Sequence, residues 1–222
     1  VFLDMGSGQI EMVENAKLND ILIYDHHTPI KQSRITQINP YFHEHNGMYE
    51  CCASTLSYLL AKSIDGNNND LVGLALTGIV GDKQLPLTGV NNEVVEEGIK
   101  NDEIVKHGGL AIPESEKVIS AKTNSKMLIE LLKRNVRYET LRQYFGRYAL
   151  KRYDGIYAHE FAEILNACGR LDMLGLGVEI CLDKNKIREA LPIKEKYVNK
   201  IHEHVYSLEK NPISMEHIQY FY

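Results

Sequence analysis

One short stretch, Ile21 to His27, constrains the fold of this chain more than any other. Its first four residues form the apolar run of a buried β-strand. Asp25, His26 and a second imidazole follow directly, and Pro29 ends the strand. A strand that ends in possible ligands is typical of an open α/β sheet, which binds its ligands at the carboxyl ends of its strands. Alone, the motif fits a chance surface turn equally well.

Two further acids strengthen this interpretation. The apolar run Phe2-Leu3 ends in Asp4 and a glycine turn, so Asp4 is expected at the carboxyl end of a strand, as Asp25 is. The 21 residues from one acid to the other suffice for a strand, a compact crossover and a parallel strand. Asp82 follows the small-residue run Gly78 to Gly81, which lets the backbone come close to another group. The predicted fold class is α/β, with a parallel sheet flanked by helices.

Hydrophobic periodicity extends the prediction along the chain. Residues 9–19 are expected to form a helix or loop, and residues 35–40 a short strand. A helix from Cys51 is expected to bury one face, made of Leu56, Leu59, Leu60 and Ile64. Further helices are expected at 71–80 and 91–107. A third is expected to end at Gly169, which would act as a left-handed cap. A long helix is expected after Pro192, and a last strand from Ile218.

Composition and length exclude several classes of protein. A chain of 222 residues with 44% hydrophobic and 25% charged residues is ordinary for a globular protein. No run of 18 apolar residues is present, so no membrane span or membrane partner is expected. The four cysteines form no zinc pattern, which favours reduced core thiols and a cytoplasmic location, although a removed signal peptide stays open.

Residues 122–152 differ in character from the rest. They carry nine Lys or Arg and two Glu, a local charge of +7 in a chain of net charge −5. Aromatic residues are interleaved with the basic ones. Basic side chains neutralise phosphates and aromatic rings stack on bases, so Arg134, Arg137 and Arg142 are candidates for a nucleic-acid-binding patch. A solvated basic face on a pair of amphipathic helices is the equal alternative.

Four motifs stand in a fixed order: Asp4-Met5-Gly6-Ser7, Asp25-His26-His27, Gly78 to Asp82, and Asn166-Ala167-Cys168-Gly169-Arg170. Together they resemble the DHH phosphoesterase superfamily, and within it the archaeal branch of the RecJ-type single-strand exonucleases. The first three motifs are widespread in the superfamily, whereas the fourth points to the RecJ branch. The resemblance covers residues 1 to about 182.

The resemblance implies a role for each matching residue. Asp4, His26 and Asp82 match metal ligands, Asp25 matches the acid behind the histidines, and His27 matches the imidazole that faces the scissile phosphate. Asn166, Gly169 and Arg170 match a phosphate-binding element. Mixed carboxylate and imidazole ligands favour Mn²⁺, with Mg²⁺ as a possible substitute, and two ions are implied for the intact protein. His43 and His45 fall in a polar loop and are expected to be solvated.

The resemblance also predicts how the chain is organised. Residues 1–118 are expected to form the DHH-type core, 119–185 a helical basic part of the catalytic domain, and 186–222 a long connecting helix. A strand with a further metal motif is expected before Val1, and a glycine-rich nucleic-acid-binding domain after Tyr222. We therefore expect the ligands present here to hold one ion rather than two.

Three functions are compatible with these residues. The first is a Mn²⁺-dependent exonuclease on single-stranded DNA or RNA in replication or repair. The second is a scaffold of a replication complex that binds GINS or other replication proteins, with weak or no catalysis. The third is a phosphatase on small substrates such as pyrophosphate, nanoRNA or cyclic dinucleotides. The intact ligand positions favour an active enzyme, and the basic segment favours longer substrates.

Overall fold

The computed structural model describes residues 1–16, 18–110, 129, 131–137, 141, 145–210, 213, 214, 219 and 220. Of the predicted basic patch, Arg134 and Arg137 lie within this part, whereas Arg142 lies outside it. Most of residues 119–144, the first part of the predicted helical part 119–185, also lie outside the described residues.

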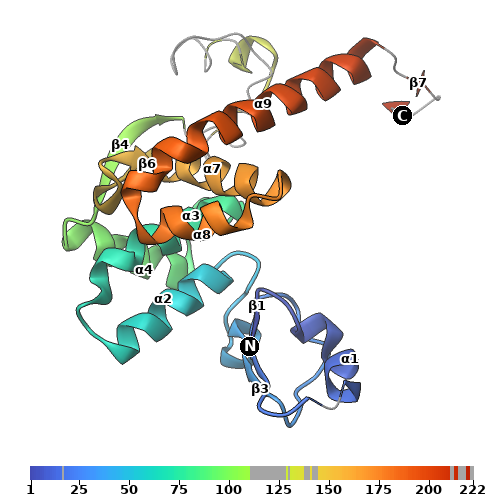
Figure 1. Cartoon of the computed structure of the whole chain (residues 1–222), viewed down its shortest axis with the longest axis vertical. Helices are drawn as coiled ribbons and strands as arrows, with labels where there is room; N and C mark the ends of the chain where they lie inside the picture. Colours follow the sequence, from blue (N-terminus) through green and yellow to red (C-terminus); the bar gives the residue numbers. More distant parts are fainter. Residues whose placement is uncertain are drawn as a thin grey trace.

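A small parallel sheet forms the N-terminal part of the molecule (Figure 1). Its strands are β1 (Phe2–Leu3), β2 (Leu22–Tyr24) and β3 (Thr36–Ile38), in the order β1-β2-β3. The crossover contains α1 (Ile10–Asn15), whose buried Ile10 and Val13 pack with Ile23 of β2. The predicted parallel arrangement is confirmed, and it brings Asp4 and Asp25 to the same edge because Leu3 pairs with Tyr24.

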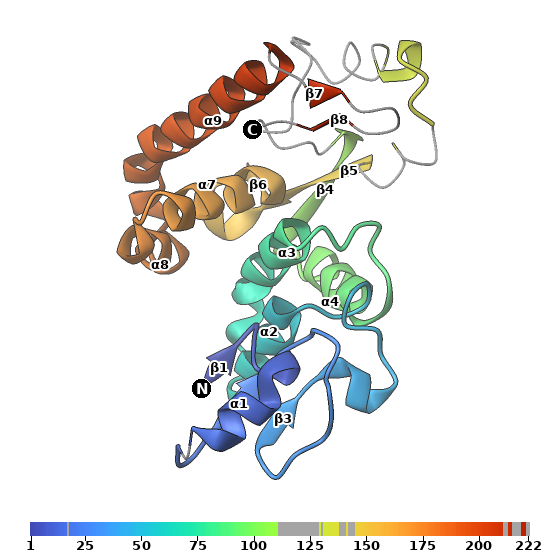
Figure 2. The ribbon, with the colours of Figure 1, turned by 90° about the vertical axis from the view of Figure 1, so that its right-hand side faces the viewer.

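A larger helical part adjoins this sheet (Figure 2). It begins with α2 (Ala53–Ile64), α3 (Val72–Gly81) and α4 (Gly89–Lys100). Helix α3 buries seven of its ten residues, as expected for a helix that is apolar on all sides. It packs at the centre of the main core with Phe161, Ile164 and Leu150.

Helix α2 turns a different face inward from the one predicted. Thr55 and Tyr58 are its buried residues, whereas Leu59 and Leu60 are about 40% exposed and Ile64 is 76% exposed. On the buried face, the hydroxyl of Thr55 donates a 2.6 Å hydrogen bond to Asn91 Oδ1 of α4, and Tyr58 joins the main core. The periodicity of aliphatic residues predicts neither contact.

An antiparallel sheet replaces part of what was predicted to be helical. It consists of β4 (Ile104–Leu110), β5 (Phe145–Leu150) and β6 (Ile156–Tyr157). The helix expected at 91–107 ends at Lys100, because Asp102 adopts a left-handed conformation and turns the chain into β4. Ile104 is buried and Val105 is 39% exposed, which is the alternation of a strand. The expected helical part at 119–185 therefore contains two strands within its described residues.

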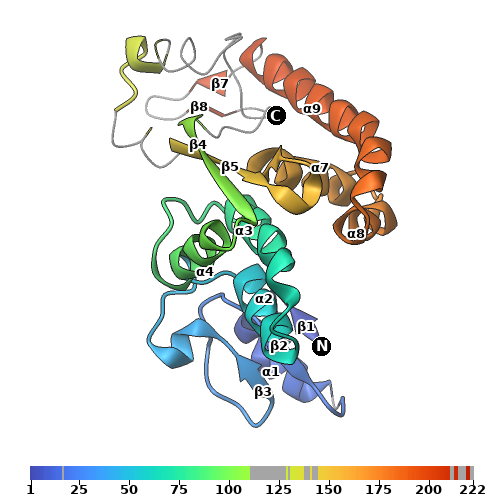
Figure 3. The same ribbon diagram turned by 90° about the vertical axis from the view of Figure 1, so that its left-hand side faces the viewer.

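Three helices complete the fold: α7 (Ala158–Arg170), α8 (Leu174–Leu182) and α9 (Ile187–Lys210) (Figure 3). The long helix was predicted, but it begins before Pro192 rather than after it. Gly169 is not a cap, because α7 continues through Arg170 and the left-handed residue beyond it is Asp172. An ion pair of 3.3 Å between Lys194 Nζ and buried Glu163 Oε2 ties α9 to α7.

Short elements connect the main ones. They are η1 (Ser7–Gln9), η2 (Pro40–His43), η3 (Asn68–Leu71), η5 (Lys151–Tyr153), η6 (Lys184–Lys186) and the strand pair β7 (Ile213–Ser214) with β8 (Gln219–Tyr220). Among the helices within the described residues, none has the length and the apolar composition needed to cross a membrane. The molecule is thus a mixed α/β structure with a parallel three-stranded sheet, flanking helices and a long C-terminal helix.

Candidate metal centre

Side chains from three separate segments meet around the imidazole of His26. Asp4 follows β1, His26 follows β2, and Asp82 is the residue at which α3 ends. The Nε2 atom of His26 lies 3.1 Å from Asp4 Oδ1 and 3.5 Å from Asp82 Oδ2. Ligand atoms of Asp4, His26 and His27 also lie within 4.8 Å of one another. The structure brings all of these predicted residues together.

The hydrogen bonds of His26 define which of its nitrogens carries the proton. Its Nδ1 atom lies 2.7 Å from the carbonyl oxygen of Gly47, and a carbonyl can only accept. Nδ1 therefore donates. Nε2 is buried and has no hydrogen-bond partner among the described residues. In the neutral imidazole the lone pair of Nε2 thus faces two carboxylates, an arrangement that a cation between them stabilises.

The site is open to solvent on one side. The side chain of His26 is 2% exposed, whereas those of Asp4 and Asp82 are 62% and 39% exposed. Asp4 adopts a left-handed backbone conformation with φ of 62°, which is uncommon for a residue other than glycine and is concentrated at functional sites. Burial raises the pKa of Asp82, and the nearby Asp4 carboxylate raises it further against the opposing effect of His26.

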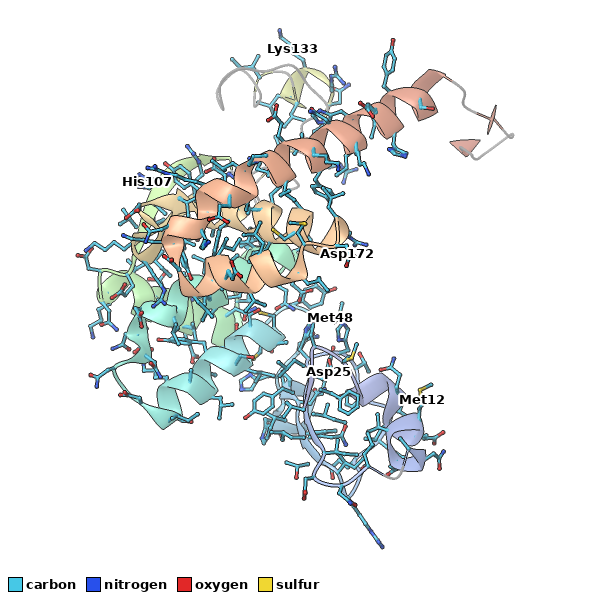
Figure 4. All side chains as sticks on the ribbon, in the orientation of Figure 1. Met12, Asp25, Met48, His107, Lys133 and Asp172 are labelled. Carbon is cyan, nitrogen blue, oxygen red and sulfur yellow. The ribbon has the colours of Figure 1, made fainter. Side chains whose placement is uncertain are left out.

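Asp25 lies behind the histidines and is almost completely buried. Its carboxylate accepts hydrogen bonds of 2.8 Å each from the backbone N–H of Ser7, the backbone N–H of His26 and Nδ1 of His27. Burial opposes ionisation of Asp25, but the bonds from His27 and from the backbone outweigh it and lower the pKa of the carboxyl group. Figure 4 labels Asp25 in the N-terminal part, near its boundary with the helical part.

His27 differs from His26 in its exposure. Its side chain is 51% exposed, and Nδ1 is held by Asp25. That hydrogen bond raises the pKa of His27, although burial opposes it, and the charges of Asp4 and Asp82 add to the rise. Because Nδ1 is occupied, Nε2 is the nitrogen left to bind a further group.

A cavity of about 610 Å³ adjoins the cluster. Asp4, Asp82 and Asn166 all line it, together with apolar and small residues of α2 and α3. Arg170 instead lines a separate groove against α9 with Tyr197, Lys200 and His204. The structure therefore brings Asn166, but not Arg170, to the cavity that Asp4 and Asp82 line. Gly169 is exposed on α7, and a β-carbon added there would touch nothing.

The predicted basic patch is distant from this cluster. Arg134 and Arg137 are exposed, and the neighbouring Lys133 lies at the top of the molecule in Figure 4, well separated from Asp25 along the long axis. Other basic residues of the segment are engaged within the protein. Arg147 lies 3.6 Å above the ring of Tyr157, while Lys151 and Arg152 form ion pairs with Asp102 and Asp70. His43 and His45 are exposed, as predicted, although His43 is the last residue of η2 and only His45 lies in a loop.

Sequence reasoning missed three residues of this site. Gly47 provides the carbonyl that binds His26, Gln84 binds the same carbonyl and Asp82 Oδ2, and Asn91 binds Gln84. Amide side chains and a loop glycine belong to no sequence motif that would indicate a metal site. The spacing of Asp82 and Gln84, two residues apart after an apolar helix, is the one available signal.

Comparison with known proteins gives one relative. The chain is 29% identical, over an alignment 261 residues long, to the uncharacterized protein MJ0831 of Methanocaldococcus jannaschii. The match covers 91% of this chain and 59% of the relative, so the chain spans less than two thirds of that protein's length. No family model matches the chain.

Proposed function

We propose that this chain is the catalytic part of a metal-dependent phosphodiesterase that, like the RecJ-type nucleases it resembles, degrades single-stranded DNA or RNA. The observation that carries the proposal is the buried Nε2 of His26, which lies between the carboxylates of Asp4 and Asp82 and makes no hydrogen bond within the described residues. A lone pair that faces two carboxylates is costly unless a proton or a metal ion lies between them, and a metal ion can bind all three groups at once. The motif order then selects the phosphoesterase class among metal enzymes.

The residues present fit a divalent transition metal. Imidazole nitrogen with two carboxylates suits Mn²⁺, and Mg²⁺ is the possible substitute. When bound, such an ion neutralises phosphoryl charge and lowers the pKa of a coordinated water. Asp4, His26 and Asp82 would hold it, and the intact protein is proposed to add the ligands of a second ion.

The chain's own groups would orient the phosphodiester. His27 is held through Nδ1 by Asp25, so its Nε2 is directed away from Asp25, and its raised pKa favours the protonated form that donates to a phosphoryl oxygen. Asn166 lines the same cavity as two of the ligands and can donate from its amide. Arg170 would reach only a more distant phosphate, along the groove against α9.

Two alternative proposals differ from this one in substrate or partner. A GINS-binding scaffold requires no cation site, whereas the arrangement of His26 favours one. A phosphatase on small substrates would use the same cluster but not residues 131–137, of which Lys133 lies far from Asp25 along the long axis (Figure 4). We propose that these residues contact the distal part of a long strand.

A substrate panel tests the proposed function. For the intact protein, which is proposed to hold both ions, we expect Mn²⁺-dependent cleavage of labelled single-stranded oligonucleotides, abolished by a chelator, at a rate well above that for a dinucleotide or pyrophosphate. Reversal of Arg134, Arg137 and Arg142 to Glu should weaken oligonucleotide binding and flatten its dependence on salt. The control reverses three exposed cations elsewhere, Lys100, Arg188 and Lys196. Faster cleavage of pyrophosphate, or no cleavage at all, would replace the nuclease by one of the two alternatives.

Gly169 offers a second prediction. A glycine inside a helix destabilises it by about 0.5–1 kcal/mol relative to alanine, and no neighbouring atom requires one here. Gly169→Ala should therefore raise the unfolding midpoint while weakening oligonucleotide binding, because the added methyl group occupies the helix surface that a phosphate approaches. Gly175→Ala on α8, which is equally open, is the control and should leave binding unchanged. Thermal unfolding and fluorescence anisotropy measure the two effects. Unchanged binding by Gly169→Ala would remove Gly169 from the phosphate-binding element.

A further inference from the structure

A buried series of hydrogen-bonded amide side chains connects the candidate metal centre to helices α2 and α4. Gln84 lies in the turn after α3 and is 3% exposed, and Asn91 on α4 is completely buried. Asn91 Nδ2 donates to Gln84 Oε1 over 2.7 Å, and Gln84 Nε2 donates to both Gly47 O and Asp82 Oδ2 over 2.8 Å. Two side chains thus link the interior of the helical part to a candidate ligand.

At each end of this series, a backbone group that can only donate or only accept determines how the Asn91 and Gln84 amides are oriented. At one end the backbone N–H of Cys52 donates to Asn91 Oδ1 over 3.3 Å, and the Thr55 hydroxyl donates to the same atom. Asn91 must therefore present its NH₂ group to Gln84. At the other end the carbonyl of Gly47 can only accept, so Gln84 must present its NH₂ group there.

Counting the hydrogens of Gln84 determines the tautomer of His26. Both hydrogens on Nε2 of Gln84 are used, one for Gly47 O and one for Asp82 Oδ2. The 3.3 Å approach of this nitrogen to His26 Nδ1 therefore has no third hydrogen available. Nδ1 of His26 donates to Gly47 O, which leaves the lone pair on Nε2 beside Asp4 and Asp82.

We propose that Gln84 is a positioning residue for a divalent cation, with Asn91 setting the orientation of its amide. It acts on two ligands at once: it holds the Asp82 carboxylate directly, and through the shared Gly47 carbonyl it keeps His26 in the tautomer that binds metal. Hydrogen bonds behind metal ligands commonly change metal affinity by 10–100-fold. This inference rests on the proposed metal site.

Two variants test it by metal affinity rather than by activity. Gln84→Met keeps the side-chain length but removes the donors to Asp82 and Gly47. Asn91→Asp touches no ligand, yet its second oxygen would face Gln84 Oε1 and favour a flipped amide, which turns Oε1 toward Asp82. Calorimetric titration of the full chain with Mn²⁺ should show a dissociation constant raised on the order of 10–100-fold in both. The Mn²⁺ electron paramagnetic resonance spectrum should also change.

A matched control separates positioning from a general loss of stability. Tyr153→Phe removes the 2.7 Å hydrogen bond from the buried Tyr153 to Cys181 O, outside the metal centre, and should lower the melting temperature without changing the Mn²⁺ affinity. Circular dichroism checks that each variant is folded, and either variant alone decides the question if the other unfolds. Wild-type affinity in a folded Gln84→Met or Asn91→Asp overturns the inference and leaves the metal site standing. Absence of Mn²⁺ binding by the wild-type chain overturns both.

Discussion

His26→Ala is expected to abolish Mn²⁺-dependent hydrolysis, with a loss of at least about 1000-fold. The substitution removes the buried nitrogen on which Asp4 and Asp82 converge. Metal-derived charge stabilisation of a phosphoryl transition state amounts to several kcal/mol, and each 1.4 kcal/mol corresponds to a factor of ten in rate. Two carboxylates without the imidazole would hold a transition metal less tightly. Oligonucleotide cleavage and calorimetric Mn²⁺ titration measure the two consequences.

The fold should tolerate the loss of His26. The Gly47 carbonyl keeps its hydrogen bond from Gln84, so no buried acceptor is left without a donor. His43→Ala, in an exposed position, is the control that removes an imidazole elsewhere and should behave as the wild type. Cleavage close to the wild-type rate by folded His26→Ala would show that His26 is not a ligand.

Gly47→Ala is expected to have the largest effect on stability, lowering the free energy of unfolding by roughly 3 kcal/mol or more. A β-carbon at this position would lie 1.8 Å from the carbonyl oxygen of His26 and 2.8 Å from its carbonyl carbon. These are backbone atoms, so no side-chain rotation can relieve the clash. The segment that carries His26 and the Gly47 carbonyl would have to separate, and Mn²⁺ affinity should fall with stability.

Chemical denaturation at equilibrium measures this effect. Gly8→Ala is the control in the same part of the molecule, because a β-carbon there has no neighbour within 4 Å. It should change the free energy of unfolding by less than about 1 kcal/mol. Equal stabilities of the two variants would mean that residue 47 and His26 are not in the close contact described here.

The sequence by itself determined the parallel arrangement of β1, β2 and β3 and the gathering of Asp4, Asp25 and His26 at one edge. These features are local: each acid directly follows an apolar run, and carboxyl ends of parallel strands meet at the same edge. It also determined that Asp82 follows a fully apolar helix and that a long charged helix lies near the C-terminal end. The motifs alone predicted the residues that meet in the cluster.

Tertiary structure alone decided the features that depend on contacts between distant segments. The run 104–110 is a strand because it pairs with β5, some forty residues later, and its apolar content alone fits a helix equally well. The apolar side of α2 is exposed because the helix turns Thr55 toward Asn91 and Tyr58 into the main core.

Tertiary structure also decided which candidate residues share a site. Asn166 and Arg170 lie one turn apart on α7. Asn166 lines the cavity beside Asp4 and Asp82, whereas Arg170 lines a groove against α9. The tautomer of His26 depends on Gly47, Gln84 and Asn91, which come from two loops and a helix and share no sequence pattern. Which group donates and which accepts depends on the neighbours that folding brings together. The sequence therefore identified the candidate ligands, and only the fold determined how they are held.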